Sequence, residues 1–140
     1  MSLAFSKQSL SAEGASKVIS GAQAKAGELG IPASIAVVDE AGVLKAMLRM
    51  DGASLISVDV AMKKAYTSAA AGFPTAEFFE FIKGDPPLLA GIPHVPGVSI
   101  IGGGIPLSVD GAVVGAIGIS GGHYTQDIEI AQAGVAAAGL

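Results

Sequence analysis

Apolar residues at the start of the chain recur every three or four positions, which is the spacing of a helix with one buried face. The pattern predicts a helix over Leu10–Leu29, with Ser9 or Ser11 placed to cap its start. Gly30 followed by Pro32 is typical of the end of such a helix. The apolar positions on this face are Ala12, Ala15, Val18, Ala22, Ala26 and Leu29.

Short apolar runs bounded by glycine, proline and aspartate predict the strands. The first two runs form a hairpin, in which Gly42 supplies the positive φ that its turn needs. Asp110 and Gly111 give a second hairpin turn. Pro106 lies near the start of its strand and therefore predicts an edge position or a bulge. The predicted strands are Ser34–Val38, Val43–Met50, Val98–Ile101, Ile105–Val109 and Val113–Ile119.

Further helices follow from the same criteria. A second helix is capped by Ser54 or Ser57 and stops at Gly72. The segment Leu88–Gly97 is expected to be irregular because prolines and glycines are closely mixed in it. The predicted helices are Ser54–Ala71, a short helix Ala76–Lys83 capped by Thr75, and a last helix that Thr125 caps and that reaches about Ala138.

This order of elements is α-β-β-α-α-β-β-β-α, and hairpins make most of the strand pairs, which favours an antiparallel sheet. Val113–Ile119 has apolar or very small side chains on both faces, which indicates that helices cover both sides of the sheet. The sequence therefore predicts an α/β (α+β) fold, a three-layer α-β-α sandwich around a five-stranded, mainly antiparallel sheet. A length of 140 residues indicates a single domain over residues 1–140.

Composition adds an expectation about assembly. Charged residues make up 14% of the chain and hydrophobic residues 51%, whereas soluble chains carry about 25% charged residues. Because exposed apolar surface usually marks an interface, we expect a homo-oligomer, a dimer or larger. The net charge of -4 provides no attraction to nucleic acid or to an anionic membrane, so neither is an expected partner.

Two further features bear on the compartment. The chain has no cysteine, which excludes disulfides and thiolate metal sites. The longest stretch without charge, Pro86–Val109, is long enough to cross a membrane, but its prolines and glycines exclude a single helix. With no targeting pattern at the start, a cytoplasmic protein is expected.

Ser120 lies in a literal G-x-S-x-G motif between a strand and a helix, as a hydrolase nucleophile does. The motif is rejected because a hydrolase acid and histidine follow the serine at a distance, whereas His123 is three residues away. Gly121 and Gly122 are instead expected to let a buried strand turn sharply into the last helix.

The loop Ser120–Gln126 is the better candidate for binding, since N–H groups at a helix start attract anions such as a carboxylate. Asp127 and Glu129 count against an anion because they already complement the helix dipole. His123 lies in this loop beside Tyr124, among glycines that leave room for a ligand.

His94 is the second imidazole and lies between Pro93 and Pro96, which stiffen its segment. Two histidines without H-x-x-x-H spacing do not make a zinc site. Much of the scarce charge lies in Lys63-Lys64 and Arg49-Met50-Asp51, which are expected to be solvated or to form surface pairs of small value. Alternatively, Lys64 or Arg49 binds the carboxylates of a ligand.

With these motifs in place, the chain resembles the GlcG/HbpS family, which is related to the C-terminal domain of PduO. The resemblance covers nearly the whole chain, including an N-terminal hairpin and a central helix motif. It is carried by Gly103-Gly104-Ile105-Pro106, the string Asp110 to Gly121, Gln126-Asp127 with Ala131, Ser34–Val38, Asp39 and Gly42, Arg49 to Ala53, and Lys64 to Ala69.

The resemblance implies an α-β-α sandwich similar to profilin and roadblock domains, assembly into oligomers, and heme binding, with heme degradation or sensing in some members. It does not imply one axial ligand. His123 stands where many members carry another residue, which either supplies an iron ligand here or marks a subgroup with different chemistry.

Three functions are left open. The first is a small oligomeric heme-binding protein for sensing, storage or degradation of heme, with His123 or His94 as axial ligand and Lys64 or Arg49 near the propionates. The second is a catabolic enzyme or accessory protein, in which Asp127 or Tyr124 orients His123 as general acid or base toward a carboxylate substrate. The third is a structural or regulatory oligomer. The remaining candidate ligand-binding residues are Gly103, Gly104, Ser120, Gly121 and Gly122.

Overall fold

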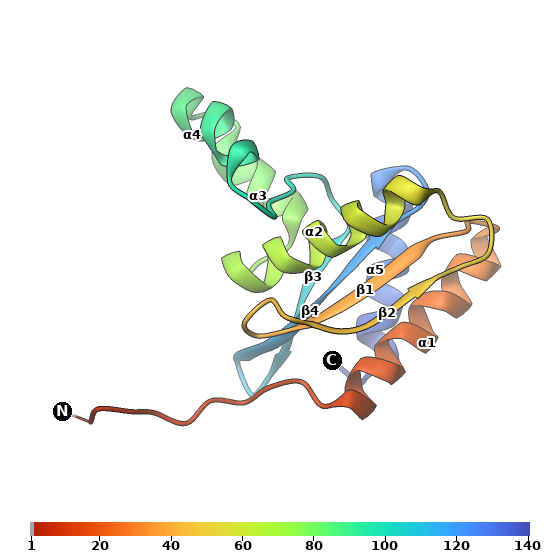
Figure 1. Cartoon of the computed structure of the whole chain (residues 1–140), viewed down its shortest axis with the longest axis horizontal. Coiled ribbons are helices and arrows are strands. Elements are labelled where there is room, and N and C mark those ends of the chain that lie inside the picture. The colour runs from red at the N-terminus through yellow and green to blue at the C-terminus, as the bar shows by residue number, and fades with distance from the viewer. Residues whose placement is uncertain (1) are drawn as a thin grey trace.

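The computed structural model describes residues 2–140, and a single antiparallel sheet lies at the centre of these residues (Figure 1). Its strands lie in the order β2-β1-β4-β3, and every neighbouring pair is antiparallel. The elements are α1 (Ala12–Leu29), β1 (Ser34–Asp39), β2 (Leu44–Arg49), α2 (Leu55–Ala71), α3 (Thr75–Ile82), α4 (Pro86–Gly91), the 3-10 turn η1 (Ile92–His94), β3 (Gly104–Val109), β4 (Ala112–Ser120) and α5 (Tyr124–Ala137).

The sheet has four strands, so the prediction of five is wrong. The segment Val98–Ile101 is apolar enough to be a strand, but it runs as a loop. Its backbone is held by a side chain instead of a neighbouring strand, because Ser99 N–H donates to Thr67 Oγ1 on α2 at 2.8 Å. The antiparallel α+β architecture is confirmed.

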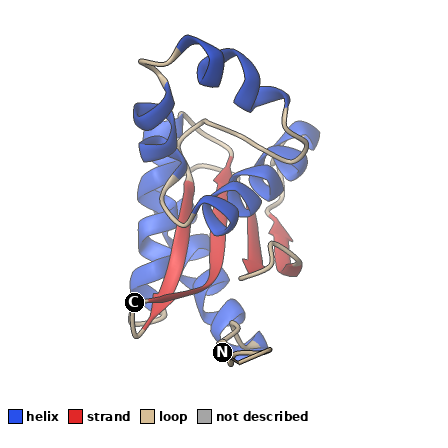
Figure 2. Cartoon of the chain, turned by 90° about the vertical axis from the view of Figure 1, so that its left-hand side faces the viewer, coloured by secondary structure: helices blue, strands red, loops and turns tan. Residues whose placement is uncertain are grey.

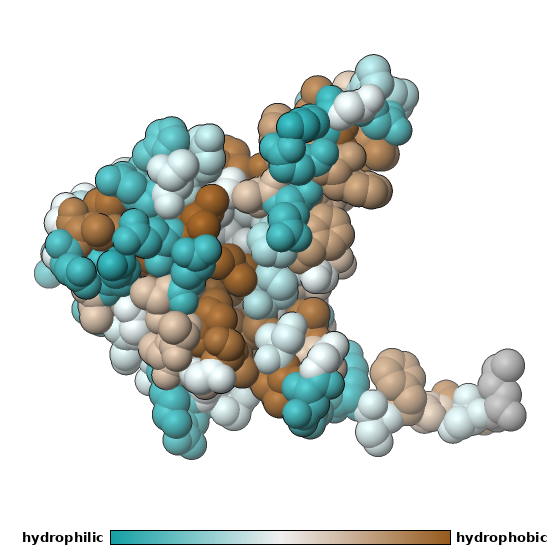
Figure 3. Space-filling model, turned by 180° about the vertical axis from the view of Figure 1, so that it is seen from behind, coloured by the Kyte–Doolittle hydropathy of each residue, from teal (hydrophilic) through white to brown (hydrophobic). Residues whose placement is uncertain are grey.

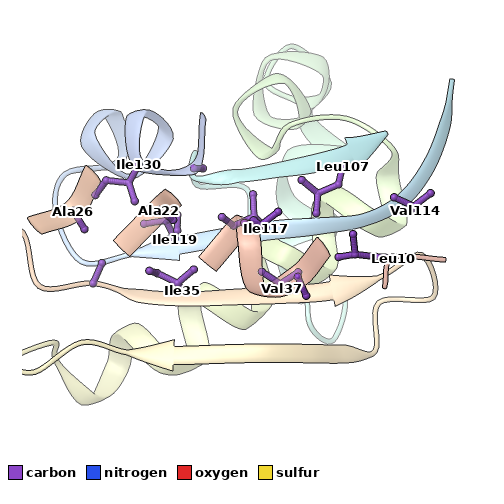
Figure 4. Packing of buried hydrophobic residues seen from close by; sticks show 14 residues of the cluster. Leu10, Ala22, Ala26, Ile35, Val37, Leu107, Val114, Ile117, Ile119 and Ile130 are labelled. Atoms are coloured by element: carbon purple, nitrogen blue, oxygen red, sulfur yellow. The ribbon is translucent and has the colours of Figure 1, made fainter. Parts of the chain in front are cut away.

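Helices cover both faces of the sheet, as predicted from the two-faced strand β4 (Figures 1 and 2). α2 packs on one face, and α1 and α5 pack together on the other. The main core lies on the α1–α5 side, where Ile35, Ile117 and Ile119 from the central strands are fully buried between the sheet and the two helices (Figure 4).

Two glycines bring α2 unusually close to the sheet. A Cβ atom at Gly118 on β4 would lie 2.1 Å from Ala61 O of α2. A Cβ at Gly104, its partner on β3, would lie 2.3 Å from Lys64 O. Only glycine permits these contacts, so the helix backbone lies directly on the strand backbones. The glycines of β3 and β4 are therefore structural.

The two helices on the other face also touch through glycine. A Cβ at Gly21 of α1 would lie 2.3 Å from Ala137 Cβ of α5, and one at Gly134 of α5 would lie 2.9 Å from Val18 O. The alanine-rich last helix thus serves contacts inside the subunit. None of the helices within residues 2–140 is long and apolar enough to cross a membrane.

Several predicted boundaries change at the ends of elements. Ser11 caps α1 by accepting from Gly14 N–H, as expected. Thr75 does not cap α3, because its hydroxyl accepts from Gly104 N–H on β3. The segment predicted to be irregular contains α4 and η1, since Pro86 and Pro87 occupy a first helical turn, where proline is tolerated.

β3 is an edge strand with a register shift after Leu107, which confirms the expectation from Pro106. Gly103 O accepts from Ile119 N–H on β4. Because backbone groups alternate in direction along an antiparallel strand, the N–H and C=O groups of the next residue, Gly104, point away from β4. By the same alternation Pro106 faces outward, where it has no N–H to offer. The outer edge of β3 therefore offers few donors to another strand.

Two parts of the chain project from the body on the same side (Figures 1 and 3). The first, here called the arm, consists of α3 and α4. The second, here called the tail, consists of residues 2–9, which run extended without helix or strand. Figure 3 shows hydrophobic surface on the body between the two.

Candidate functional site

The start of α5 is organised by His123, which is the N-cap residue in place of the predicted Thr125. Thr125 N–H donates to His123 Nδ1 at 3.3 Å, and Thr125 Oγ1 lies 2.8 Å from the same nitrogen. The ring of Tyr124 packs on the imidazole, with ring centroids 4.3 Å apart. His123 is exposed, and its Nε2 makes no hydrogen bond within residues 2–140.

Two more N–H groups of this loop are bonded within the chain. Gly122 N–H donates to Asp127 Oδ1 at 3.0 Å, and His123 N–H donates to Gln126 Oε1 at 3.0 Å. With Thr125 N–H bound to the imidazole, three of the N–H groups that the expected anion site would use are occupied. A carboxylate held by this loop is therefore not supported.

Beside Tyr124 the surface is hollowed over a volume of about 410 Å³. One wall comes from α3 and the opposite wall from the loop that leads into β3. Most of the lining is apolar, and Tyr124 connects it to the imidazole of His123. The residues that line this hollow are Ala76, Phe79, Glu80, Ile100, Ile101, Gly102 and Tyr124.

Lys64 is not available to a ligand, contrary to the sequence-based expectation. It is 2% exposed, and its Nζ donates to Ile119 O at 2.8 Å and to Asp127 Oδ2 at 3.0 Å. Burial lowers the pKa of the Lys64 ammonium group, while the charge of Asp127 opposes that shift. The pair connects α2, β4 and α5 and is a structural element of the fold.

Asp127 likewise does not orient His123. Its carboxylate is buried and binds Lys64 and Gly122 N–H, so the predicted acid–base pair is not formed. Thr125 is the residue that holds the imidazole. The sequence pattern does not reveal this role of Thr125, because it predicts Thr125 as the cap of the last helix.

The candidate glycines mostly serve packing. A Cβ at Gly103 would lie 2.8 Å from Ile119 O and 2.9 Å from Lys64 Nζ, and Gly104 lies beneath α2. Gly121 turns the chain past Pro32, whose carbonyl oxygen would lie 2.6 Å from its Cβ. This confirms the sharp turn expected from Gly121 and Gly122. Gly102, which was not predicted, is the glycine that lines the hollow.

Ser120, Arg49 and His94 lie away from the hollow. Ser120 pairs with Ser34 on β1, and Ser34 pairs with Arg49 on β2. Since strands are about 4.8 Å apart, Arg49 is on the far side of the sheet from the edge strand β3. Arg49 Nε donates to Ala53 O at 3.1 Å. His94 is exposed in η1 and is not among the lining residues.

The arrangement is therefore an imidazole whose Nε2 is free of hydrogen bonds within residues 2–140 and whose ring packs on Tyr124, a lining residue of an apolar hollow. One such nitrogen can act as a metal ligand or exchange a proton. Within residues 2–140 no group of three or more histidines and carboxylates is placed to hold a metal ion. The site fits a ligand that brings its own metal better than a bare ion.

Fold and hollow together define a small α-β-α domain with a ligand-sized apolar site on its surface. The family model for Haem degrading protein HbpS-like matches residues 10–136. The chain thus belongs to the HbpS-like family, as its motifs predicted.

Curated relatives agree with this assignment. An uncharacterized 15.0 kDa protein from Citrobacter freundii is 34% identical over 84% of this chain and 84% of its own length. Protein GlcG of Escherichia coli is 33% identical, over 79% of this chain and 81% of its own. Corrinoid adenosyltransferase PduO of Salmonella typhimurium is 37% identical over 81% of this chain, which corresponds to 34% of PduO.

Solved structures share the whole fold. A PduOC:heme complex superposes with a TM-score of 0.85 and 36% identity, covering 92% of this chain and 94% of that one. HbpS superposes with a TM-score of 0.87 and 32% identity, covering 96% and 93%. Heme binding thus occurs among the structural relatives of this chain.

Proposed function

We propose that this chain is a heme-binding protein and that the hollow beside Tyr124 receives the porphyrin. The observation that carries the proposal is an apolar hollow of about 410 Å³ whose lining residue Tyr124 packs on the exposed imidazole of His123. Phe79, Ile100 and Ile101 supply the apolar contacts that a macrocycle needs. The family assignment and the PduOC:heme complex support the same ligand.

His123 Nε2 is the proposed axial ligand. As a helix cap the imidazole accepts at Nδ1, which places its proton on Nε2. A metal ligand needs the lone pair on Nε2, so the proton must move to Nδ1. Thr125 Oγ1, 2.8 Å from Nδ1, is placed to accept it. In that tautomer the bond from Thr125 N–H to Nδ1 is given up and a bond from Nδ1–H to Thr125 Oγ1 takes its place, so Thr125 is the proposed positioning residue.

Lys83, the residue that follows α3, is the proposed partner of the propionates in place of Lys64 and Arg49. Lys83 forms an ion pair with Glu80, and Glu80 lines the hollow. A propionate would compete with Glu80 for the Lys83 ammonium group. Oligomeric assembly in the cytoplasm is part of the proposal.

A hemin titration of the wild type and of single variants tests this function. We expect saturation at one hemin per chain, with a Soret band that shifts when His123 is replaced by alanine and binding weakened at least tenfold. Thr125→Val should weaken binding less, whereas Thr125→Ser should behave as wild type. His94→Ala is the matched control, since it removes an exposed imidazole outside the hollow.

Equal titrations for wild type and His123→Ala would overturn His123 as ligand. Phe79→Ser tests the hollow independently, and it should weaken binding without changing the wavelength of the band. Hemin that binds without saturation to all variants would reject the proposed function itself.

A further inference from the structure

We propose that the tail of a second copy of this chain closes the open side of the hollow, with Phe5 as the contacting side chain. The tail carries large apolar side chains that touch little in one subunit. Leu3 is 105% exposed and Phe5 is 86% exposed. Since burying such a side chain is worth about 1.5–3 kcal/mol, their exposure favours an intersubunit contact.

Leu3 and Phe5 alternate with Ser2, Ala4 and Ser6, so an extended tail presents its large apolar side chains on one side. The partner surface must therefore be narrow and apolar. The hollow offers such a surface, because Ile101 in its wall is 51% exposed.

The tail cannot close the hollow of its own subunit. Leu10 N–H donates to Val114 O, and Lys7 forms an ion pair with Glu40 at 3.3 Å, so the tail is anchored beside the β1–β2 turn. From Leu10, whose backbone bond fixes the start of the tail, to Phe5 an extended chain spans about 17 Å. β3 alone, which separates the tail from the hollow, spans about 20 Å.

A twofold axis between two subunits brings the tail of one within reach of the hollow of the other. The tail leaves the body at the Val109 end of β3, where Leu10 and Val109 line one groove, while Gly102 places the hollow at the other end. Two copies with antiparallel β3 strands bring the tail of each subunit to the hollow of its partner. Tail and arm project from the same side of the body, as this arrangement requires (Figure 3).

Side chains carry this contact, since the outer edge of β3 has few free donors. Gly104 N–H is bound to Thr75, and Pro106 has no N–H. Phe5 of each tail would cover the side of the partner's hollow that lies open in one subunit. The docking of the tail stands without heme; the role of Phe5 at the heme rests on the proposed function.

Disulfide trapping tests the docking, because the chain has no cysteine of its own. A Phe5→Cys chain with a size tag is mixed with an untagged Ile101→Cys chain and oxidised mildly without hemin. The matched control replaces Ile101→Cys by Val43→Cys, which is 60% exposed beside β2, at the opposite edge of the sheet. We expect at least tenfold more mixed dimer with Ile101→Cys than with Val43→Cys.

Equal trapping of the two pairs would overturn the docking, as would a wild-type monomer by light scattering at tens of micromolar. Phe5→Ser should fold normally, because Phe5 is exposed in the subunit, and should dissociate the dimer. Trapping without saturable hemin binding would leave the docking intact and reject the proposed function. Hemin binding without trapping would reject only the docking.

Discussion

A buried ammonium group holds three elements of this fold together. Lys64 reaches from α2 through the space above Gly103 to Ile119 O on β4 and to Asp127 on α5. Both charges are nearly inaccessible to water, so each depends on the other for its solvation.

Removal of Lys64 or Asp127 alone should therefore lower the free energy of unfolding more than removal of both charges. Lys64→Met leaves the Asp127 carboxylate buried without its cation, and we expect a loss of about 3–5 kcal/mol in the free energy of unfolding. The double variant Lys64→Met/Asp127→Asn keeps an acceptor for Gly122 N–H and should recover most of that loss. Urea unfolding measures both.

The control is Lys63→Met, the neighbouring lysine, which pairs with Asp59 near the surface and should change stability by less than about 1 kcal/mol. If Lys64→Met and its double variant were equally unstable, the pair would contribute through packing alone.

At the scale of elements, close contact between α2 and the sheet decides the architecture. The helix rests on Gly104 and Gly118, and a methyl group at either position would overlap a helix carbonyl. Adding atoms to such a contact forces the backbones apart.

We expect Gly118→Ala to reduce the free energy of unfolding by about 3 kcal/mol, because the methyl group has no space. Gly27→Ala is the matched control. Gly27 lies in α1 with nothing within 4 Å of a Cβ, so alanine should stabilise the helix by about 1 kcal/mol. Thermal unfolding compares the two; a tolerated Gly118→Ala would contradict the close approach.

Apolar patterns and turn residues predicted the strands β1, β2, β3 and β4, and all the long helices, to within a few residues. It failed where a side chain replaced a strand partner. Val98–Ile101 has the composition of a strand, but Thr67 binds its backbone. That interaction joins residues 32 positions apart, which local patterns do not record.

The site was partly predictable for a similar reason. His123 and Tyr124 follow a buried strand directly, and glycines beside them signal available space, so local sequence identified them. Phe79, Ile101 and Gly102 come from other segments that only the fold brings together. Lys64 was misassigned because sequence alone does not show which of two adjacent lysines is buried.

At the scale of the whole molecule, the low content of charged residues reflects close packing inside the subunit more than an apolar interface. Glycine and alanine are abundant because α2 meets the sheet, and α1 meets α5, at backbone distance. Many of these small residues are therefore used in contacts inside the subunit. Of the large apolar residues that stay exposed, Leu3 and Phe5 lie on the tail and Phe79 and Ile101 line the hollow, while others such as Leu55, Ile56 and Phe81 lie elsewhere.

Stability should also depend on pH through Lys64. Its pKa in the folded state lies below its ordinary value of 10.5, so the unfolded chain retains a proton that the folded chain has lost. In that interval the free energy of unfolding rises with pH, and the gain is complete above 10.5. Urea unfolding between neutral pH and pH 10.5 measures this gain in the free energy of unfolding, with Lys64→Met/Asp127→Asn as the reference. A constant difference would contradict the lowered pKa.

The blocked outer edge of β3 has a consequence for behaviour at high concentration. A bare strand edge is a template on which other chains extend a sheet into fibrils. At β3 the proline and the threonine-bound amide remove that template. Growth would then have to begin at β2, where the charge of Lys45 in an exposed strand opposes the approach of a second copy. The proposed dimer would thus form without extending the sheet of either subunit.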